Sequence, residues 1–293
     1  MSSRSRRRWR ALGVLAVCTG LVAGGSWAAW RFIDTSEVLV RERCTAIVGT
    51  DSFDLSPEQA ANAALISAVS MERGLPARAA SIGIATAIQE SKLRNIDYGD
   101  DAGPDSRGLF QQRPSQGWGS EEQVMDPVYA ANRFFHELEQ LAPDFQDLDV
   151  TVAAQIVQRS AYPDAYADHE PEARAYASAL TGHSPAALNC VLKAPDESGD
   201  PAAMLEALQA QWPSTQSSAQ APLSRAASAE GGRTVAIPAT GQRGWALVQW
   251  VVANADQFGV TAASFGGQRW IRADHGWATA TGADGAVTIT FAG

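Results

Sequence analysis

Glu90 is the residue of this sequence best placed for acid–base chemistry. The sequence around it predicts a helix, and the residues three, four and seven positions before it on the same face are small: Ala87, Thr86 and Gly83. Small side chains let another segment approach closely, so we expect the carboxyl group to meet backbone and apolar groups rather than open water. Such desolvation disfavours the charged form and would let Glu90 protonate a leaving group near neutral pH. The spacing alone also fits an exposed glutamate near a helix C-terminus.

Two further motifs follow Glu90 and its neighbour Ser91. Eighteen residues after Glu90 begins the sequence GLFQQRP, residues 108–114, and residues 153–163 read AAQIVQRSAYP, an Ala-rich predicted helix ending in an aromatic residue. In order and spacing these elements resemble the soluble lytic transglycosylases and goose-type lysozymes. That group has Glu-Ser at a helix end, then Gly-Leu-Met-Gln with a Pro nearby, and a third Ala-rich motif. Phe110 stands in place of the usual Met, and the third motif lacks the family's Tyr-Asn pair.

The resemblance implies a lysozyme-like domain over residues 44–192 that cleaves the MurNAc-GlcNAc glycan of peptidoglycan, with Glu90 as catalytic acid and base and with no cofactor or metal. In lytic transglycosylases the acid protonates the glycosidic oxygen and the substrate's acetamido group assists at the anomeric carbon. The same carboxylate then deprotonates the muramic O6 hydroxyl, which gives a 1,6-anhydro sugar. Hydrolysis would instead need a second carboxyl group. The candidates for it, each of which also fits a solvated turn or a cation site, are Asp97, Asp100, Asp101 and Asp105.

The resemblance also implies which residues contact acetylated sugars, because amide and aromatic side chains suit such a groove. The candidates are Ser91, Gln111, Gln112, Gln158 and Tyr162. Either Gln158 or Tyr162 takes the sugar-contacting place in the third motif, and packing within the loop is the alternative for the two loop glutamines. Since binding and catalytic residues coincide in such a groove, the alternative function is a non-enzymatic peptidoglycan-binding or assembly protein, in a secretion or conjugation apparatus for example.

The first thirty residues predict export or a membrane anchor. Residues 1–10 form a basic cytoplasmic tip with five arginines, and residues 11–30 carry no charge. Twenty such residues are just long enough to cross the hydrocarbon core as a helix. Because positive charge stays on the cytoplasmic side, we expect a single-pass protein of the cell membrane whose bulk lies outside the cytoplasm. A small-x-small sequence at residues 26–28 makes secretion after signal cleavage the alternative.

Cys44 and Cys190 are the two cysteines outside the predicted membrane segment. In an oxidising compartment such a pair predicts a disulfide, and two free buried cysteines are the alternative. The five arginines of residues 1–30 contribute +5 to a formal net charge of −9, so the remainder of the chain carries −14. This acidic body argues against nucleic acid as the main partner.

The elements that must position Glu90 are mainly helical over residues 44–192. Capping residues, prolines at first turns and apolar spacing predict five helices. They cover residues 57–73 and 76–93, begin at 127, cover 150–157, and run from 171 to about 181. The glycine-bearing loop of about residues 94–125 lies between the second and third helices, and loops of this length are often functional.

The composition changes after residue 193. Residues 194–241 are rich in Ala, Ser, Gln, Pro and Gly, which predicts a flexible linker interrupted by an amphipathic piece at 203–212. Residues 242–293 predict a small α+β module that contains His275 as its one histidine, too few for a catalytic zinc site. The module is therefore expected to be non-catalytic. It should contain a helix that includes Trp245 and ends near Gly259, and strands at 260–265, 269–271, 277–279 and 287–291.

Overall fold

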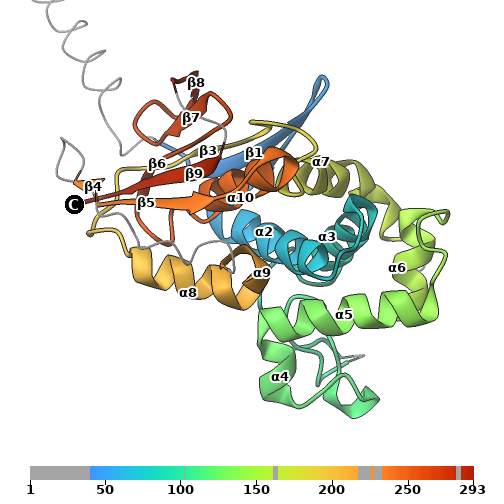
Figure 1. The fold of residues 1–293 in the computed structure, drawn as a ribbon. Coiled ribbons are helices and arrows are strands. Elements are labelled where there is room, and N and C mark those ends of the chain that lie inside the picture. Colours follow the sequence, from blue (N-terminus) through green and yellow to red (C-terminus); the bar gives the residue numbers. More distant parts are fainter. Residues whose placement is uncertain (1–39, 102, 161–163, 217–225, 228–232, 282–284) are drawn as a thin grey trace, which may run out of the picture. The chain divides into compact units, whose positions relative to one another are not determined.

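The computed structural model describes residues 40–101, 103–160, 164–216, 226–227, 233–281 and 285–293. The chain divides after Arg41, and residues 42–293 form one compact unit (Figure 1). The predicted membrane segment, residues 11–30, lies outside the described residues. None of the helices that the structure describes is both long and apolar enough to cross a membrane.

The five predicted helices are confirmed, and they pack against one another. They are α2 (Pro57–Glu72), α3 (Ala77–Ser91), α5 (Pro127–Leu141), α6 (Val150–Gln158) and α7 (Glu170–Leu180). A capping box starts α2, because Ser56 Oγ accepts from Gln59 N and Gln59 Oε1 accepts from Ser56 N. Three shorter helices lie in the connections. They are η2 (Pro114–Gln116), α4 (Glu121–Met125) and η3 (Ala167–His169).

Helix α3 lies at the centre of this group, packed against α2, α5, α6 and α7. Its residues 79–88 are buried without a break. A β-carbon on Gly83 would lie 2.9 Å from Ile66 Cγ2 and 3.1 Å from Phe135 Cζ. The small residues before Glu90 therefore allow neighbouring helices to approach closely, as the sequence predicts.

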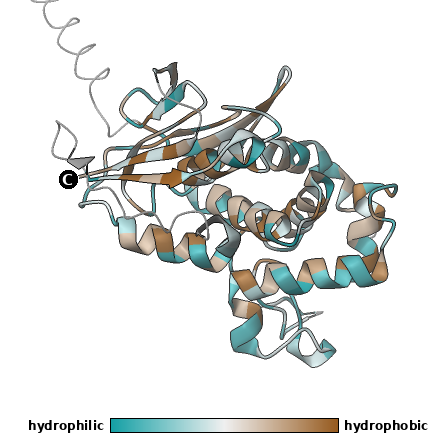
Figure 2. Ribbon diagram, in the orientation of Figure 1, coloured by the Kyte–Doolittle hydropathy of each residue, from teal (hydrophilic) through white to brown (hydrophobic). Residues whose placement is uncertain are grey.

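Helix α5 shows how hydrophobic spacing produces this packing. Asp126 Oδ1 caps the helix by accepting from the backbone N–H groups of Val128 and Tyr129. Phe134, Phe135 and Leu138 are fully buried, while polar residues face outward, which gives the helix its two-sided colouring in Figure 2. This apolar face closes one side of the core around α3.

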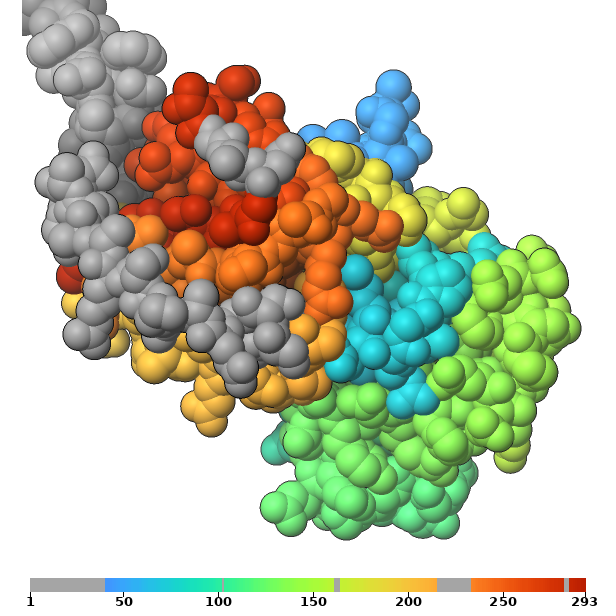
Figure 3. Space-filling view, in the orientation of Figure 1, coloured from blue at the N-terminus to red at the C-terminus, as the bar shows by residue number. Residues whose placement is uncertain are grey.

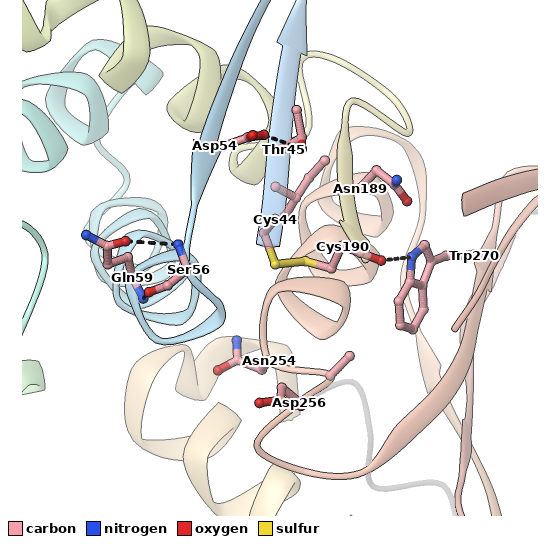
Figure 4. Close-up of a disulfide and its surroundings, with 12 residues drawn as sticks. Cys44, Thr45, Asp54, Ser56, Gln59, Asn189, Cys190, Asn254, Asp256 and Trp270 are labelled. Atoms are coloured by element: carbon pink, nitrogen blue, oxygen red, sulfur yellow. Dashed lines mark hydrogen bonds between the residues drawn. A yellow bond between two sulfur atoms is a disulfide. The ribbon is translucent and has the colours of Figure 1, made fainter. Parts of the chain in front are cut away.

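The sequence did not predict the first of two antiparallel sheets, so the fold is mixed rather than mainly α. This sheet contains β1 (Arg43–Val48), β2 (Asp51–Leu55) and β3 (Leu188–Val191), in the order β2-β1-β3. Cys44 of β1 lies opposite Cys190 of β3, and the two form a disulfide with a Cα–Cα distance of 4.0 Å (Figure 4). The predicted disulfide is confirmed.

The second sheet lies beside helix α10 (Gly241–Ala253), and its strands have the order β4-β5-β9-β6-β7-β8. This sheet and α10 together form the C-terminal region, which begins at β4. Its strands are β4 (Ala226–Ala227), β5 (Arg233–Pro238), β6 (Val260–Phe265), β7 (Gln268–Ile271), β8 (Gly276–Thr279) and β9 (Ala286–Phe291). The helix and four strands predicted for residues 242–293 are confirmed, but α10 ends at Ala253, before the predicted end near Gly259. The predicted start of the module is wrong, because β5 lies before residue 242 and pairs with β9.

The prediction of a flexible linker over residues 194–241 is also wrong for the described part of that range. It contains α8 (Pro201–Gln211) and α9 (Pro213–Gln216), in addition to strands β4 and β5. Asp200 caps α8, and Met204, Leu208 and Trp212 are buried. The amphipathic piece predicted at 203–212 corresponds to α8 and Trp212, and α8 packs against α2.

The C-terminal region packs directly onto the helices and the first sheet, and Figure 3 shows its orange and red residues adjoining the cyan helices. Gln249 of α10 is fully buried, and its Oε1 accepts from the backbone N–H groups of Ala187 and Leu188, both at 2.9 Å. Trp270 Nε1 donates to Cys190 O at 3.2 Å, as Figure 4 shows. Strand β3 is therefore held from both sides, by the disulfide to β1 and by hydrogen bonds to the C-terminal region.

Candidate active site

Glu90 lies in the last turn of α3, where two other segments reach its carboxyl group. Tyr166 Oη donates to Glu90 Oε1 at 2.7 Å, and Tyr166 is fully buried just before η3. The side chain of Gln158, the last residue of α6, also hydrogen-bonds Glu90. The structure thus brings together residues from α3, α6 and the segment before α7 at one carboxyl group.

The surroundings of Glu90 raise its pKa. Burial is the largest cause, since it removes water from the charged form, and the negative charge of Asp100 adds a smaller effect in the same direction. The hydrogen bonds from Tyr166 and Gln158 oppose this change by stabilising the carboxylate. Because burial outweighs them, Glu90 keeps its proton to a higher pH than an ordinary glutamate, as a general acid requires.

Ser91 connects the end of α3 to the loop that carries the GLFQQRP motif, residues 108–114. Its hydroxyl is buried and lies 2.7 Å from Leu109 O, to which it donates. On the next residue of the loop, Phe110 O accepts from Gln158 Nε2 at 2.9 Å. The GLF segment is therefore held between α3 and α6, and Ser91 serves this connection inside the protein.

The glycine and the two glutamines of the same motif have different surroundings. A β-carbon on Gly108, whose φ is +76°, would lie 2.2 Å from Val124 O, so only glycine fits there. Gln111 is half-buried, and its Nε2 lies 3.3 Å from Gly108 O. Gln112 is 1% exposed and donates from Nε2 to Ala130 O of α5. Gln112 therefore holds the loop onto α5, whereas Gln111 stays partly accessible.

The four loop aspartates differ in their relation to Glu90. Asp105 accepts from Arg113 Nε at 2.8 Å and from Ser115 N at 3.0 Å. These interactions lower the pKa of Asp105, with the hydrogen bonds from Ser115 as the main cause. Asp97, Asp100 and Asp101 are all exposed, and Asp100 is the loop acid whose charge raises the pKa of Glu90.

The sequence reasoning missed Tyr166. Burial, and then the negative charge of Glu90, raise the pKa of Tyr166, so its hydroxyl remains a donor. Tyr162, the predicted aromatic contact, lies outside the described residues. An aromatic residue was expected after the Ala-rich helix, and Tyr162 was assigned to that place. The next aromatic residue, four positions later, is Tyr166. His169 Nε2 lies 3.0 Å from Gln89 Oε1, which ties η3 to the residue before Glu90.

Within the parts of the chain that the structure describes, no three His, Cys, Asp or Glu side chains lie close enough together to hold a metal ion. No model of a known protein family matches the chain, and no curated protein sequence is significantly similar to it.

Proposed function

We propose that this protein cleaves the glycan strands of peptidoglycan as a lytic transglycosylase, with Glu90 as its single acid and base. The observation that supports this proposal is the partly buried carboxyl group of Glu90, with its raised pKa and its hydrogen bonds from Tyr166 and Gln158. The loop that meets this group carries the GLFQQRP motif, held through Ser91 and Gln158.

The proposed reaction has two proton transfers through one carboxyl group. Glu90 first donates its proton to the glycosidic oxygen as the bond to the anomeric carbon breaks, while the oxygen of the substrate's acetamido group bonds to that carbon. The Glu90 carboxylate then accepts the proton of the muramic O6 hydroxyl as O6 bonds to the anomeric carbon and the acetamido oxygen leaves. Glu90 ends protonated and no water is consumed. Tyr166 stabilises the carboxylate between the two steps by its hydrogen bond.

Hydrolysis is the second candidate reaction, and Asp100 is the observation that favours it. Its charge acts on Glu90, and its Oδ1 accepts from Gly103 N at 2.8 Å, which holds the carboxylate in the loop. A water positioned by Asp100 would attack the anomeric carbon in place of O6 and would give a reducing end.

We also propose that residues 11–30 anchor the chain in the cell membrane with residues 42–293 outside the cytoplasm, or that they form a cleaved signal of a secreted protein. The disulfide between Cys44 and Cys190 supports this location, because disulfides persist in oxidising compartments.

Digestion of purified peptidoglycan by the full-length chain in detergent tests the proposed reaction, with mass spectrometry of the soluble sugars. We expect fragments with 1,6-anhydro ends, one water lighter than hydrolytic products. Glu90→Gln keeps the shape of the side chain but removes its acid, so turnover should fall by at least about a hundredfold. Glu122→Gln, an exposed change in α4, is the matched control and should retain activity.

Each other outcome has a defined meaning. Fragments with reducing ends would show that the reaction is hydrolysis and not transglycosylation. The Asp100→Asn variant should then produce no such fragments. If the protein sediments with the peptidoglycan and releases no soluble sugar fragments, the non-enzymatic binding or assembly protein would be favoured. Full activity of the Glu90→Gln variant would refute the assignment of the catalytic residue.

A further inference from the structure

A cavity of about 370 Å³ lies at the opposite end of α3 from Glu90. Its walls come from the first turns of α3, from α7 and from the segment that follows α7. The residues that line it are Ala77, Arg78, Ser81, Arg174, Ser178 and His183. From Arg78 to Glu90 the helix rises by about 18 Å, so the cavity and the candidate active site are separate.

The charged and polar groups of the cavity wall are suited to an anion. Two arginines and a histidine line it together with Ser81 and Ser178, and none of the lining residues is acidic. The hydroxyl of Ser81 donates to Ala77 O, and that of Ser178 shares a hydrogen bond with Ser184 Oγ. Gln242 Nε2 lies 3.1 Å from His183 Nε2, and an amide nitrogen donates, so this ring nitrogen accepts and Nδ1 is the donor of the His183 ring. No side chain caps the first turn of α3, where Ala77 and Arg78 lie, so the positive end of the helix dipole adds to this field.

The two arginines have different roles. Arg78 Nε donates to Phe145 O, and its Nη2 donates to Leu148 O, so this guanidinium is fixed in the wall. Arg174 is 62% exposed at its side chain and pairs with Glu170 at 3.2 Å, one turn away on α7. An exposed pair of this kind contributes little to stability, so a ligand can take the place of Glu170 at small cost.

The charge of the whole chain restricts the kind of anion. Residues 31–293 carry a formal charge of −14, and a long polyanion would be repelled by such a surface. A cavity of this volume matches the lower range of small-molecule sites and has room for a phosphate group with a small organic substituent. Arginine and histidine donors at one end of a helix suit phosphate oxygens.

We propose that this cavity is a binding site for a small phosphate monoester, independent of catalysis at Glu90. The phosphate group lies against Arg174, His183 and the first turn of α3. Arg78 shapes the site and is held by the backbone of the loop before α6.

Isothermal titration of the full-length chain with glycerol 3-phosphate and with inorganic phosphate, at constant ionic strength, tests this proposal. We expect both probes to bind, with the monoester at least as tight as free phosphate. Arg174→Gln should weaken binding by about tenfold, because it removes a charge-assisted hydrogen bond. Glu170→Gln should strengthen binding, because it releases Arg174 from its partner.

Arg133→Gln is the matched control, since Arg133 also pairs with a glutamate four residues along its helix and is partly exposed. It should leave binding unchanged, as should Glu90→Gln. A second variant, Ser178→Leu, fills the cavity without removing charge and should also abolish binding. Failure of both probes to bind, equal binding of acetate and phosphate, or unchanged affinity in both the Arg174 and Ser178 variants would overturn the proposal.

Discussion

At the scale of single residues, the Tyr166 hydroxyl controls how readily Glu90 releases its proton. Its hydrogen bond lowers the pKa of Glu90, while burial raises that pKa by more. Tyr166→Phe removes the donor and keeps the ring, so the pKa of Glu90 should rise further. The limb of the pH–rate profile on which activity falls with rising pH should therefore move to higher pH. Measurement of kcat/KM against pH checks this, with Tyr129→Phe as the control, and an unmoved limb would contradict it.

The raised pKa of Glu90 also predicts a pH-dependent stability. The folded protein holds this proton more tightly than the unfolded chain, whose glutamate has the ordinary pKa of 4.5. The stabilisation is thus complete below about pH 4.5 and is lost as the pH rises through the pKa of the folded state. Glu90→Gln is neutral at every pH and avoids the loss.

Calorimetry of the wild type and of Glu90→Gln at pH 4 and pH 8 measures this difference. The Tm of the variant should exceed that of the wild type at pH 8, by about 2–4 °C for each 1 kcal/mol of stabilisation, and the two should converge at pH 4. A constant difference between the two proteins at both pH values would show that titration of Glu90 is not its cause.

At the scale of elements, local signals predicted those helices and strands that are bounded by capping residues, prolines or glycines. The capping box at Ser56 and the Asp126-Pro127 start gave α2 and α5, and glycine-bounded apolar runs gave β6 to β9. Strand β3 lacked such a signal, because it has four residues and its partner β1 lies far away in the sequence. The hairpin of β1 and β2 is local and was missed. The amphipathic spacing at 203–212 indicated α8, although the composition around it predicted a linker.

The candidate site, like the fold, could be predicted only where the signal is local in the sequence. Glu90 and the loop that meets it follow from motifs, since their spacing is local. The inward turn of Gln112 toward α5 and the contact between Tyr166 and Glu90 depend on how separate helices pack. No pattern within one helix contains that information.

Helix α10 provides a test of how one element holds others. Gln249 accepts from two backbone N–H groups and its Nε2 donates to Ala179 O and Ser184 O, all inside the protein. Gln249→Ala leaves these groups without a partner, and each such group costs about 1–3 kcal/mol. We expect a loss of at least about 3 kcal/mol in the free energy of unfolding by urea. Gln257→Ala, an exposed change, is the control, and equal stability of the two variants would refute this role of Gln249.

At the scale of the whole molecule, the helices and the C-terminal region depend on one another for burial. Helix α10 covers parts of α2, α7 and β3. A chain that ends at residue 240 should therefore expose apolar surface and lose fixed side-chain packing. Near-UV circular dichroism and limited proteolysis check this, with a chain that begins at residue 40 as the control. A truncated chain with native-like spectra would instead show that the helices fold by themselves.

The disulfide also has a mechanical consequence. Residues 1–41 connect to the compact unit at Glu42, and Cys44 follows two positions later in β1, the central strand of its sheet. Tension applied through the N-terminal segment enters at this strand, and the covalent bond to Cys190 passes it to β3 and to the C-terminal region. Strand β1 cannot peel away under load while that bond is intact. A pull on the N-terminal segment therefore loads the two joined strands before the helices that carry Glu90 and Gln158.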